Sequence, residues 1–123
     1  MREDAGMANP LVDHQLEVTP ADTAAALESG DATVIDVRET YEWEAGRIAG
    51  TRHIELERLA GQAESIDRDR PVIFHCRVGV RSIMAAQAFH AAGYDAKSMA
   101  GGIQAWVDEG RPVEPSDGTV AAH

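Results

Sequence analysis

Apolar and polar residues follow one another along the chain in blocks that predict strands separated by helices. The clearest predicted strand covers residues 71–75, Pro-Val-Ile-Phe-His, a continuous apolar run typical of a central strand in a parallel sheet. Residues 32–37 are rich in β-branched side chains and predict a second buried strand. Segment 94–99 and shorter stretches around Leu16 and Ile54 complete the predicted set of strands.

The intervening segments carry helix signals. Thr19, Pro20 and Asp22 supply an N-cap, a first-turn proline and a first-turn acid, so a helix is expected to about Ser29, ended by Gly30. Helical spacing of apolar residues from position 81 to Gly93 predicts a longer helix. Segments 39–45, 59–66 and 103–109 predict three shorter ones. Alternating strands and helices indicate an α/β fold whose parallel sheet is covered on both faces.

A chain of 123 residues and 13.2 kDa is expected to form one compact domain. We predict a flexible N-terminal segment at 1–14, a domain at 15–113 and a tail at 114–123, since both ends are polar and lack a sustained period. The chain contains no apolar run long enough to cross a bilayer and no pattern of a secretory signal. We therefore expect no membrane partner and a cytoplasmic protein.

Charge is unevenly distributed. A formal net charge of −10, without a basic stripe, argues against nucleic acid as a partner. Between positions 70 and 94, however, there is no Asp or Glu, whereas Arg70, Arg77 and Arg81 all fall there, around the single cysteine, Cys76. One cysteine and five scattered histidines predict neither a metal site nor another cofactor.

Cys76 stands between a predicted strand and a predicted helix, at the edge of the sheet where α/β proteins bind ligands. Gly79 allows the chain to turn so that backbone N–H groups point inward, and the start of the helix adds positive potential. Together with Arg77 and Arg81, these groups favour a thiolate, and hence a nucleophile. The alternative is a buried, inert cysteine. His75, the preceding residue, is expected to be a hydrogen-bonded core histidine, because adjacent strand residues point to opposite faces.

The segment Cys76-Arg77-Val78-Gly79-Val80-Arg81-Ser82 resembles the active-site loop of rhodaneses. Further family motifs are matched in order, and the resemblance spans roughly residues 16–113. They are Asp36-Val37-Arg38-Glu39, Glu44-Ala45-Gly46-Arg47-Ile48-Ala49-Gly50, and Gly101-Gly102 with Trp106, Gly110 and Pro112. Arg47 stands where the family usually has histidine and Thr51 where it often has alanine, which we expect to affect local packing.

The resemblance implies a three-layer α/β/α fold with a five-stranded parallel sheet, and a ping-pong transfer of sulfane sulfur through a Cys76 persulfide. Residues 77–82 would bind a small anionic donor such as thiosulfate, and Asp36 and Arg38 would lie behind the loop and hold it. The acceptor would be cyanide or a thiol, with glutathione, thioredoxin and a sulfur-carrier protein as candidates.

Two other functions compete with sulfur transfer. Phosphatases and arsenate reductases also place a cysteine before an arginine-bearing anion cradle, but four residues separate Cys76 from Arg81, whereas the related phosphatases have five. A shorter loop suits a sulfur atom better than a phosphate. Rhodanese-like domains also serve as non-catalytic docking modules, a class usually marked by loss of the cysteine, which this chain retains.

Overall fold

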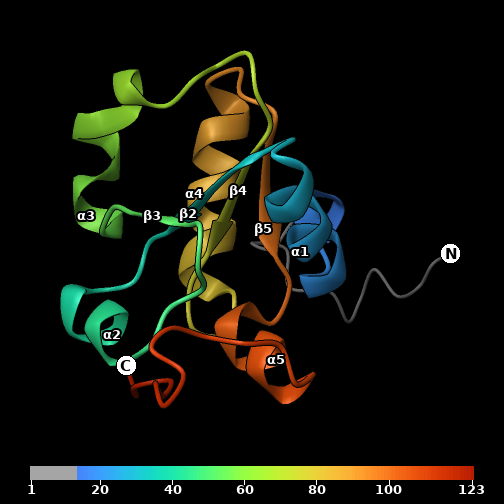
Figure 1. Cartoon of the computed structure of the whole chain (residues 1–123). Helices are drawn as coiled ribbons and strands as arrows, with labels where there is room; N and C mark the ends of the chain where they lie inside the picture. Colours follow the sequence, from blue (N-terminus) through green and yellow to red (C-terminus); the bar gives the residue numbers. More distant parts are fainter. Residues whose placement is uncertain (1–13) are drawn as a thin grey trace, which may run out of the picture.

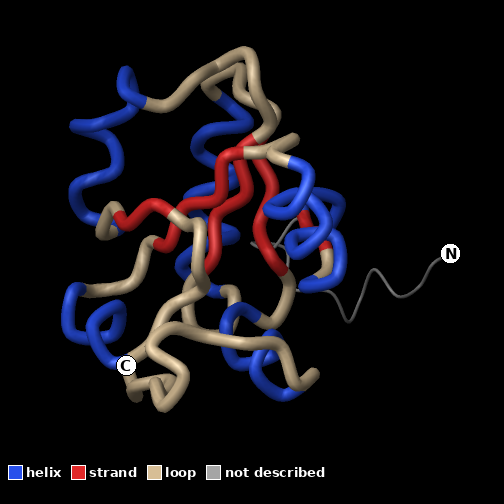
Figure 2. Tube along the Cα trace, viewed as in Figure 1, coloured by secondary structure: helices blue, strands red, loops and turns tan. Residues whose placement is uncertain are grey.

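The computed structural model describes residues 14–123 of the chain and contains a single sheet of five parallel strands (Figures 1 and 2). The predicted flexible segment lies outside the described residues, except for His14. The strand order is β1-β5-β4-β2-β3, which places β4 at the centre. The strands are β1 (Glu17–Val18), β2 (Thr33–Asp36), β3 (Arg52–His53), β4 (Val72–His75) and β5 (Ala96–Met99).

Helices cover both faces of this sheet, as expected for a three-layer fold; Figure 1 shows α1 and α3 on opposite sides of the strands. The helices are α1 (Pro20–Ser29), α2 (Thr40–Ala45), α3 (Leu56–Leu59), α4 (Val80–Ala91) and α5 (Gly102–Asp108). Two 3₁₀ segments, His14–Leu16 and Ala60–Ser65, complete the described elements. Within residues 14–123, no helix is both long enough and apolar enough to span a membrane.

The two cores follow the alternation of side chains along the strands. Ile35 and Phe74 face α3 and α4 and belong to one cluster of buried apolar residues. Their neighbours Val34 and Ile73 face the other way, toward α1 and α5, and belong to a second cluster that includes Trp106. Because the central strands are buried on both sides, they read as continuous apolar runs, which is why the sequence predicts them clearly.

The predicted and observed elements differ where the sequence signal is short. The predicted helix 59–66 in fact begins at Leu56, and its larger part is the 3₁₀ segment. The predicted strand around Ile54 is confined to two residues before it, and Leu16 ends a 3₁₀ turn rather than lying in a strand. These elements have few apolar positions, so a one-turn shift changes little burial and the period cannot locate their ends.

Residues 114–123, predicted as a tail, run back along α2 (Figure 1). Glu114 pairs with Arg47 through two backbone hydrogen bonds of 2.9 and 2.7 Å. Farther along, the Thr119 amide donates to the Ala45 carbonyl at 2.9 Å, and Val120 packs against the second apolar cluster. A polar composition concealed these contacts, because most of them use the backbone.

A buried group of charged and polar side chains lies where β2 and β4 end. The Arg38 guanidinium donates to both carboxylate oxygens of Asp36 at 2.8 to 3.1 Å, and also to the Gly46 carbonyl at 2.8 Å. The His75 Nε2 atom lies 3.8 Å from the Asp36 carboxylate, and all three side chains are fully buried. His75 is thus a core residue as predicted, but the expected hydrogen bond is missing: neither ring nitrogen has a partner among the described residues.

This environment moves two pKa values downward. Burial works to raise the pKa of Asp36, but the neighbouring His75 and the hydrogen bonds from Arg38 outweigh it and hold that pKa below its ordinary value of 3.8. Burial lowers the pKa of His75 below 6.5, and the charge on Arg38 adds to the effect while Asp36 opposes it. At neutral pH the group therefore holds an ion pair beside a neutral imidazole.

The first turn of α5 supports the segment after β4. The amides of Ile103 and Gln104 donate to the carbonyls of Cys76 and Arg77 at 2.9 and 3.0 Å. Gly102, with φ of +61°, brings the backbones so close that a β-carbon there would lie 2.4 Å from the Arg77 carbonyl oxygen. The glycine pair seen in the sequence thus serves a close backbone approach as well as a turn.

Gly102→Ala should destabilise the protein by at least about 3 kcal/mol, because it adds a steric overlap with the carbonyls of residues 76 and 77 to left-handed backbone strain. Gly30→Ala is the matched control. Its φ is +77°, but a β-carbon there meets no atom within 4 Å, so a loss of about 1 kcal/mol is expected. Urea denaturation measures both free energies; equal losses would contradict the close-contact explanation.

Acidification should destabilise the fold in two stages. Below pH 6.5 the unfolded chain binds a proton at His75 that the folded chain resists, so stability falls; below 3.8 it falls further as the Asp36 carboxylate is lost from its pair. His75→Leu should abolish the first stage and weaken the second, because only Arg38 then holds the pKa of Asp36 down. Urea denaturation across this pH range provides the measurement, and an unchanged first stage in the variant would refute the assignment to His75.

Candidate functional site

The segment of residues 76–82, the Cys76 loop, connects β4 to α4 at the carboxyl edge of the sheet. β4 lies between β5 and β2, so the loop emerges at the centre of that edge. Gly79 directly precedes α4 and has φ of +108° and ψ of −10°, a conformation that favours glycine. This turn reverses the chain so that the start of a twelve-residue helix faces the cysteine.

The Cys76 sulfur is buried but has polar neighbours. Its side chain is 1% exposed and also borders the first apolar cluster. Of the loop amides predicted to point inward, that of Gly79 donates to Sγ at 3.1 Å, and the Ser82 hydroxyl lies 3.5 Å from Sγ. An N–H donor and the helix N-terminus both stabilise negative charge on sulfur. The surroundings are therefore those of an anion site lying over hydrocarbon.

A pair of hydroxyl groups supports the sulfur from below. The Ser82 Oγ atom lies 2.7 Å from Oγ of Ser98, which is on β5, and 3.3 Å from the Gly79 carbonyl oxygen. Both serines are fully buried. The hydroxyls thus satisfy one another beneath the loop and link it to the adjacent strand. Ser82 belongs to the loop motif seen in the sequence, whereas the only sequence signal of Ser98 is that it is a polar residue in a buried strand.

A cavity of about 270 Å³ opens above the cysteine. We call it the Cys76 cavity; its lining residues are Cys76, Arg77, Val78, Val80, Arg81 and His123. The Arg77 Nε atom is buried and has no hydrogen-bond partner among the described residues. Val78 and Val80 are 48% and 64% exposed, so their side chains form an apolar rim. A small anion entering here would meet a cavity lined by two arginines and the cysteine.

Arg81 is engaged by an acid that the sequence analysis did not select. Its Nη1 and Nη2 atoms donate to the two carboxylate oxygens of Glu42, on α2, at 2.8 and 2.9 Å. The Glu42 side chain is fully buried, and its Oε1 atom also accepts from the Glu39 amide at 3.0 Å. The capping spacing Glu39-x-x-Glu42 is the signal that could have identified this acid.

The pair shifts the pKa of both partners toward the charged forms. Burial works to raise the pKa of Glu42, but hydrogen bonds from Arg81 and from the Glu39 amide hold it below its ordinary value of 4.5. Hydrogen bonds to Glu42 raise the pKa of Arg81 although burial opposes them. The bidentate pair therefore stays ionised and ties the start of α4 to α2.

The other residues noted in the sequence lie farther from the sulfur. Asp36 and Arg38 connect the end of β2 to the end of α2 through the Gly46 carbonyl, rather than bonding to the Cys76 loop. Arg47, at the position of the family histidine, lies 5.4 Å over the Trp43 ring and pairs with Glu114, so its effect is on packing. Within residues 14–123, no cluster of three His, Cys, Asp or Glu side chains could hold a metal ion.

Comparison with known proteins gives relatives of two kinds. The chain is 32% identical over 101 residues to the putative sulfurtransferase YtwF of Bacillus subtilis, and the match covers 79% of this chain and 98% of that protein. It is 33% identical over 109 residues to the HTH-type transcriptional regulator Rv0324 of Mycobacterium tuberculosis, covering 81% of this chain. That match spans only 48% of the regulator, which has a further region outside it.

Solved structures agree on the fold. A rhodanese-related protein from Thermoplasma volcanium matches with a TM-score of 0.73 and 32% sequence identity. The match covers 79% of this chain and 95% of that one. A protein from Rhodopseudomonas palustris, described as a possible tyrosine phosphatase, has a TM-score of 0.70 and 30% identity, covering 80% and 83% of the two chains. The family model of the rhodanese-like domain matches residues 19–109, and the chain therefore belongs to the rhodanese-like domain family.

Proposed function

We propose that this protein is a sulfurtransferase that carries sulfane sulfur as a persulfide on Cys76. The observation that carries the proposal is the Gly79 amide donating to Sγ at 3.1 Å at the base of the Cys76 cavity. A donor group already directed at sulfur stabilises the thiolate before reaction and the terminal sulfur afterwards. YtwF, which is named as a putative sulfurtransferase and matches this chain over almost its whole length, supports the same function.

The first half-reaction loads the enzyme. The Cys76 thiolate attacks the outer sulfur of thiosulfate, a new S–S bond forms, and the S–S bond within thiosulfate breaks with its electron pair leaving on sulfite. The dianionic donor enters beside Arg77, whose buried Nε atom lacks another partner among the described residues. The cysteine then holds one additional sulfur, and the loop amides stabilise its negative charge.

The second half-reaction discharges the persulfide to an acceptor. A thiolate or cyanide attacks the terminal sulfur, the S–S bond to Cys76 breaks, and the cysteine thiolate is restored as the leaving group. Cys76 is the single cysteine of the sequence, so no second thiol of the chain can resolve the persulfide. The acceptor is therefore external, either cyanide in an assay or a thiol such as glutathione, thioredoxin or a sulfur-carrier protein.

Arg77 and Arg81 take different roles in this proposal. Arg81 gives both terminal nitrogens to the buried Glu42, so it acts mainly by holding the loop against α2. Arg77 lines the same cavity, and its buried Nε atom has no hydrogen-bond partner among the described residues, so this proposal assigns donor binding to Arg77. The sequence predicts equal roles for the two arginines. It cannot distinguish them, because the partner of Arg81 lies in another part of the fold.

Two observations define the alternatives. The R. palustris neighbour is described as a possible tyrosine phosphatase, but the four-residue spacing from Cys76 to Arg81 favours a sulfur atom over a phosphate group. The match within the transcriptional regulator favours a docking module, but the cysteine, the glycine and both arginines of the loop are present here. We therefore place sulfur transfer ahead of both alternatives.

Incubation with thiosulfate should add one sulfur atom to the protein, and dithiothreitol should remove it, because the loop stabilises a persulfide. Intact-mass spectrometry detects the change, and thiocyanate formed from thiosulfate and cyanide measures turnover. Cys76→Ser is the matched control, expected to show neither adduct nor turnover. Absence of an adduct with any sulfane donor would favour a docking module; phosphoester hydrolysis abolished by Cys76→Ser would favour a phosphatase.

Arg77→Ala should lower kcat/KM for thiosulfate about tenfold, mainly through KM, with little loss of stability, because it removes a donor contact. Arg81→Ala should instead destabilise the fold by about 3 kcal/mol, since it leaves the Glu42 carboxylate buried without its partner. Steady-state kinetics and urea denaturation separate the two effects. Arg58→Ala, on the exposed side of α3, is the control for loss of a positive charge. The reverse pattern would contradict the assigned roles.

A further inference from the structure

Segment 114–123 is attached to α2 along its length. The Tyr41 hydroxyl donates to the Ala122 carbonyl at 2.9 Å, in addition to the Thr119 amide bond to Ala45. Gly46 lies directly beneath the segment, since a β-carbon at this position would be 2.5 Å from the Thr119 carbonyl oxygen. These contacts carry the chain from α5 across to the Cys76 loop. There, His123 lies near Cys76, although the two are 47 positions apart in the sequence.

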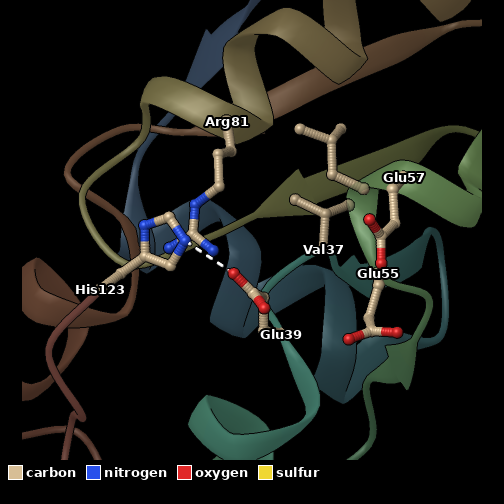
Figure 3. Close-up of a pocket in the computed structure, with 7 residues that line it drawn as sticks. Val37, Glu39, Glu55, Glu57, Arg81 and His123 are labelled. Atoms are coloured by element: carbon tan, nitrogen blue, oxygen red, sulfur yellow. Dashed lines mark hydrogen bonds and ion pairs between the residues drawn. The ribbon is translucent and has the colours of Figure 1, made fainter.

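The segment delivers one side chain, His123, to the cavities beside the sulfur. His123 lines the Cys76 cavity together with the loop residues. It also lines a neighbouring cavity of about 250 Å³, which we call the glutamate cavity, formed by Val37, Glu39, Glu55, Leu56, Glu57, Arg81 and His123. In Figure 3 the imidazole lies beside the Arg81 guanidinium, with Glu55 and Glu57 across the cavity. His123 and Arg81 are the residues shared by both linings.

Both shared side chains have an acidic partner, although that of His123 is exposed. Arg81 is fixed by its bidentate pair with Glu42, and the His123 Nε2 atom lies 3.0 Å from a carboxylate oxygen of Glu39 (Figure 3). The two groups therefore form a wall between the cavities. Because Cys76 is only 1% exposed, reactants must approach it through the Cys76 cavity, and this wall limits the space they have.

We propose that His123 is a specificity-determining residue: its imidazole separates the Cys76 cavity from the glutamate cavity and restricts the cysteine to reactants that are narrow around the reacting atom. Removal of the imidazole would join the two spaces, so that a bulky acceptor could extend into the glutamate cavity while its sulfur reaches Cys76. As a statement about acceptors, the inference rests on the proposed sulfur transfer. As a statement about access to the thiol, it stands on the geometry of the two cavities.

Alkylation of the single cysteine tests access without requiring turnover. The rate constant for N-phenylmaleimide, a bulky reagent, is compared with that for iodoacetamide, a small one, by intact mass. His123→Ala should raise the ratio of the two rate constants about tenfold, because it removes a steric restriction. His123→Gln, which keeps much of the bulk and a hydrogen bond to Glu39, should leave the ratio within about twofold of the wild type.

A second variant acts on the segment from a distance. Gly46→Ala directs a β-carbon at the Thr119 backbone and should displace the segment, and hence His123, without changing any side chain of the two cavities. Gly46 has φ of 174°, an extended conformation open to alanine, so the effect comes from the contact. We expect the alkylation ratio to rise in this variant as in His123→Ala. An unchanged or lower ratio in His123→Ala would overturn the proposal.

Persulfide discharge tests the same restriction during catalysis. After loading with thiosulfate, the ratio of discharge rates with dithiothreitol and with cyanide should rise in His123→Ala in parallel with the alkylation ratio. If the wild type does not load sulfur, the proposed function fails, but the alkylation ratio still tests whether His123 restricts access to Cys76. If it loads and discharges normally but neither ratio changes in His123→Ala, the proposed role of His123 fails alone.

Discussion

The site depends on the hydrogen bonds that turn the carbonyls of Cys76 and Arg77 toward α5. The Ile103 and Gln104 amides donate to these carbonyls at 2.9 and 3.0 Å and so fix the direction of two peptide groups. With those carbonyls directed toward α5, the chain can reverse at Gly79, whose amide then donates to the cysteine sulfur. Buried peptide groups need partners, so the first turn of α5 is as much part of the site as the loop.

The proposed function requires a nearly inaccessible thiol to react, and its surroundings differ on its two sides. Cys76 borders the apolar cluster on one side. On the other side it meets the Gly79 amide, the N-terminus of α4 and the Cys76 cavity. The polar contacts of the sulfur thus come from the loop that also lines the cavity.

The two ion pairs near the site serve mainly to position it. Asp36 with Arg38 joins the end of β2 to the end of α2, and Glu42 with Arg81 joins α2 to the start of α4. Together the two pairs connect the end of β2, helix α2 and the start of α4. Buried ion pairs contribute little net stability because both charges lose hydration, but their geometry is specific, and loss of one partner is costly.

The sequence by itself determined the α/β class, the sheet strands with strong apolar runs and the loop around Cys76. These features depend on neighbouring residues: an apolar run marks β4, a glycine allows the turn, and the helix begins after it. Short segments such as β3 were poorly predicted, because two residues carry no usable period. The family match rested on the order of local motifs, which needs no three-dimensional information.

Only the tertiary structure decided which groups surround the cysteine. Glu42 reaches Arg81 across 39 positions, and His123 reaches Glu39 across 84. Ser98 supports Ser82 because β5 lies beside β4 in the sheet. Such contacts follow from how strands and helices pack, and no local pattern encodes them. The proposed division of roles between Arg77 and Arg81 could not come from the sequence either, since it depends on Glu42, which belongs to another helix.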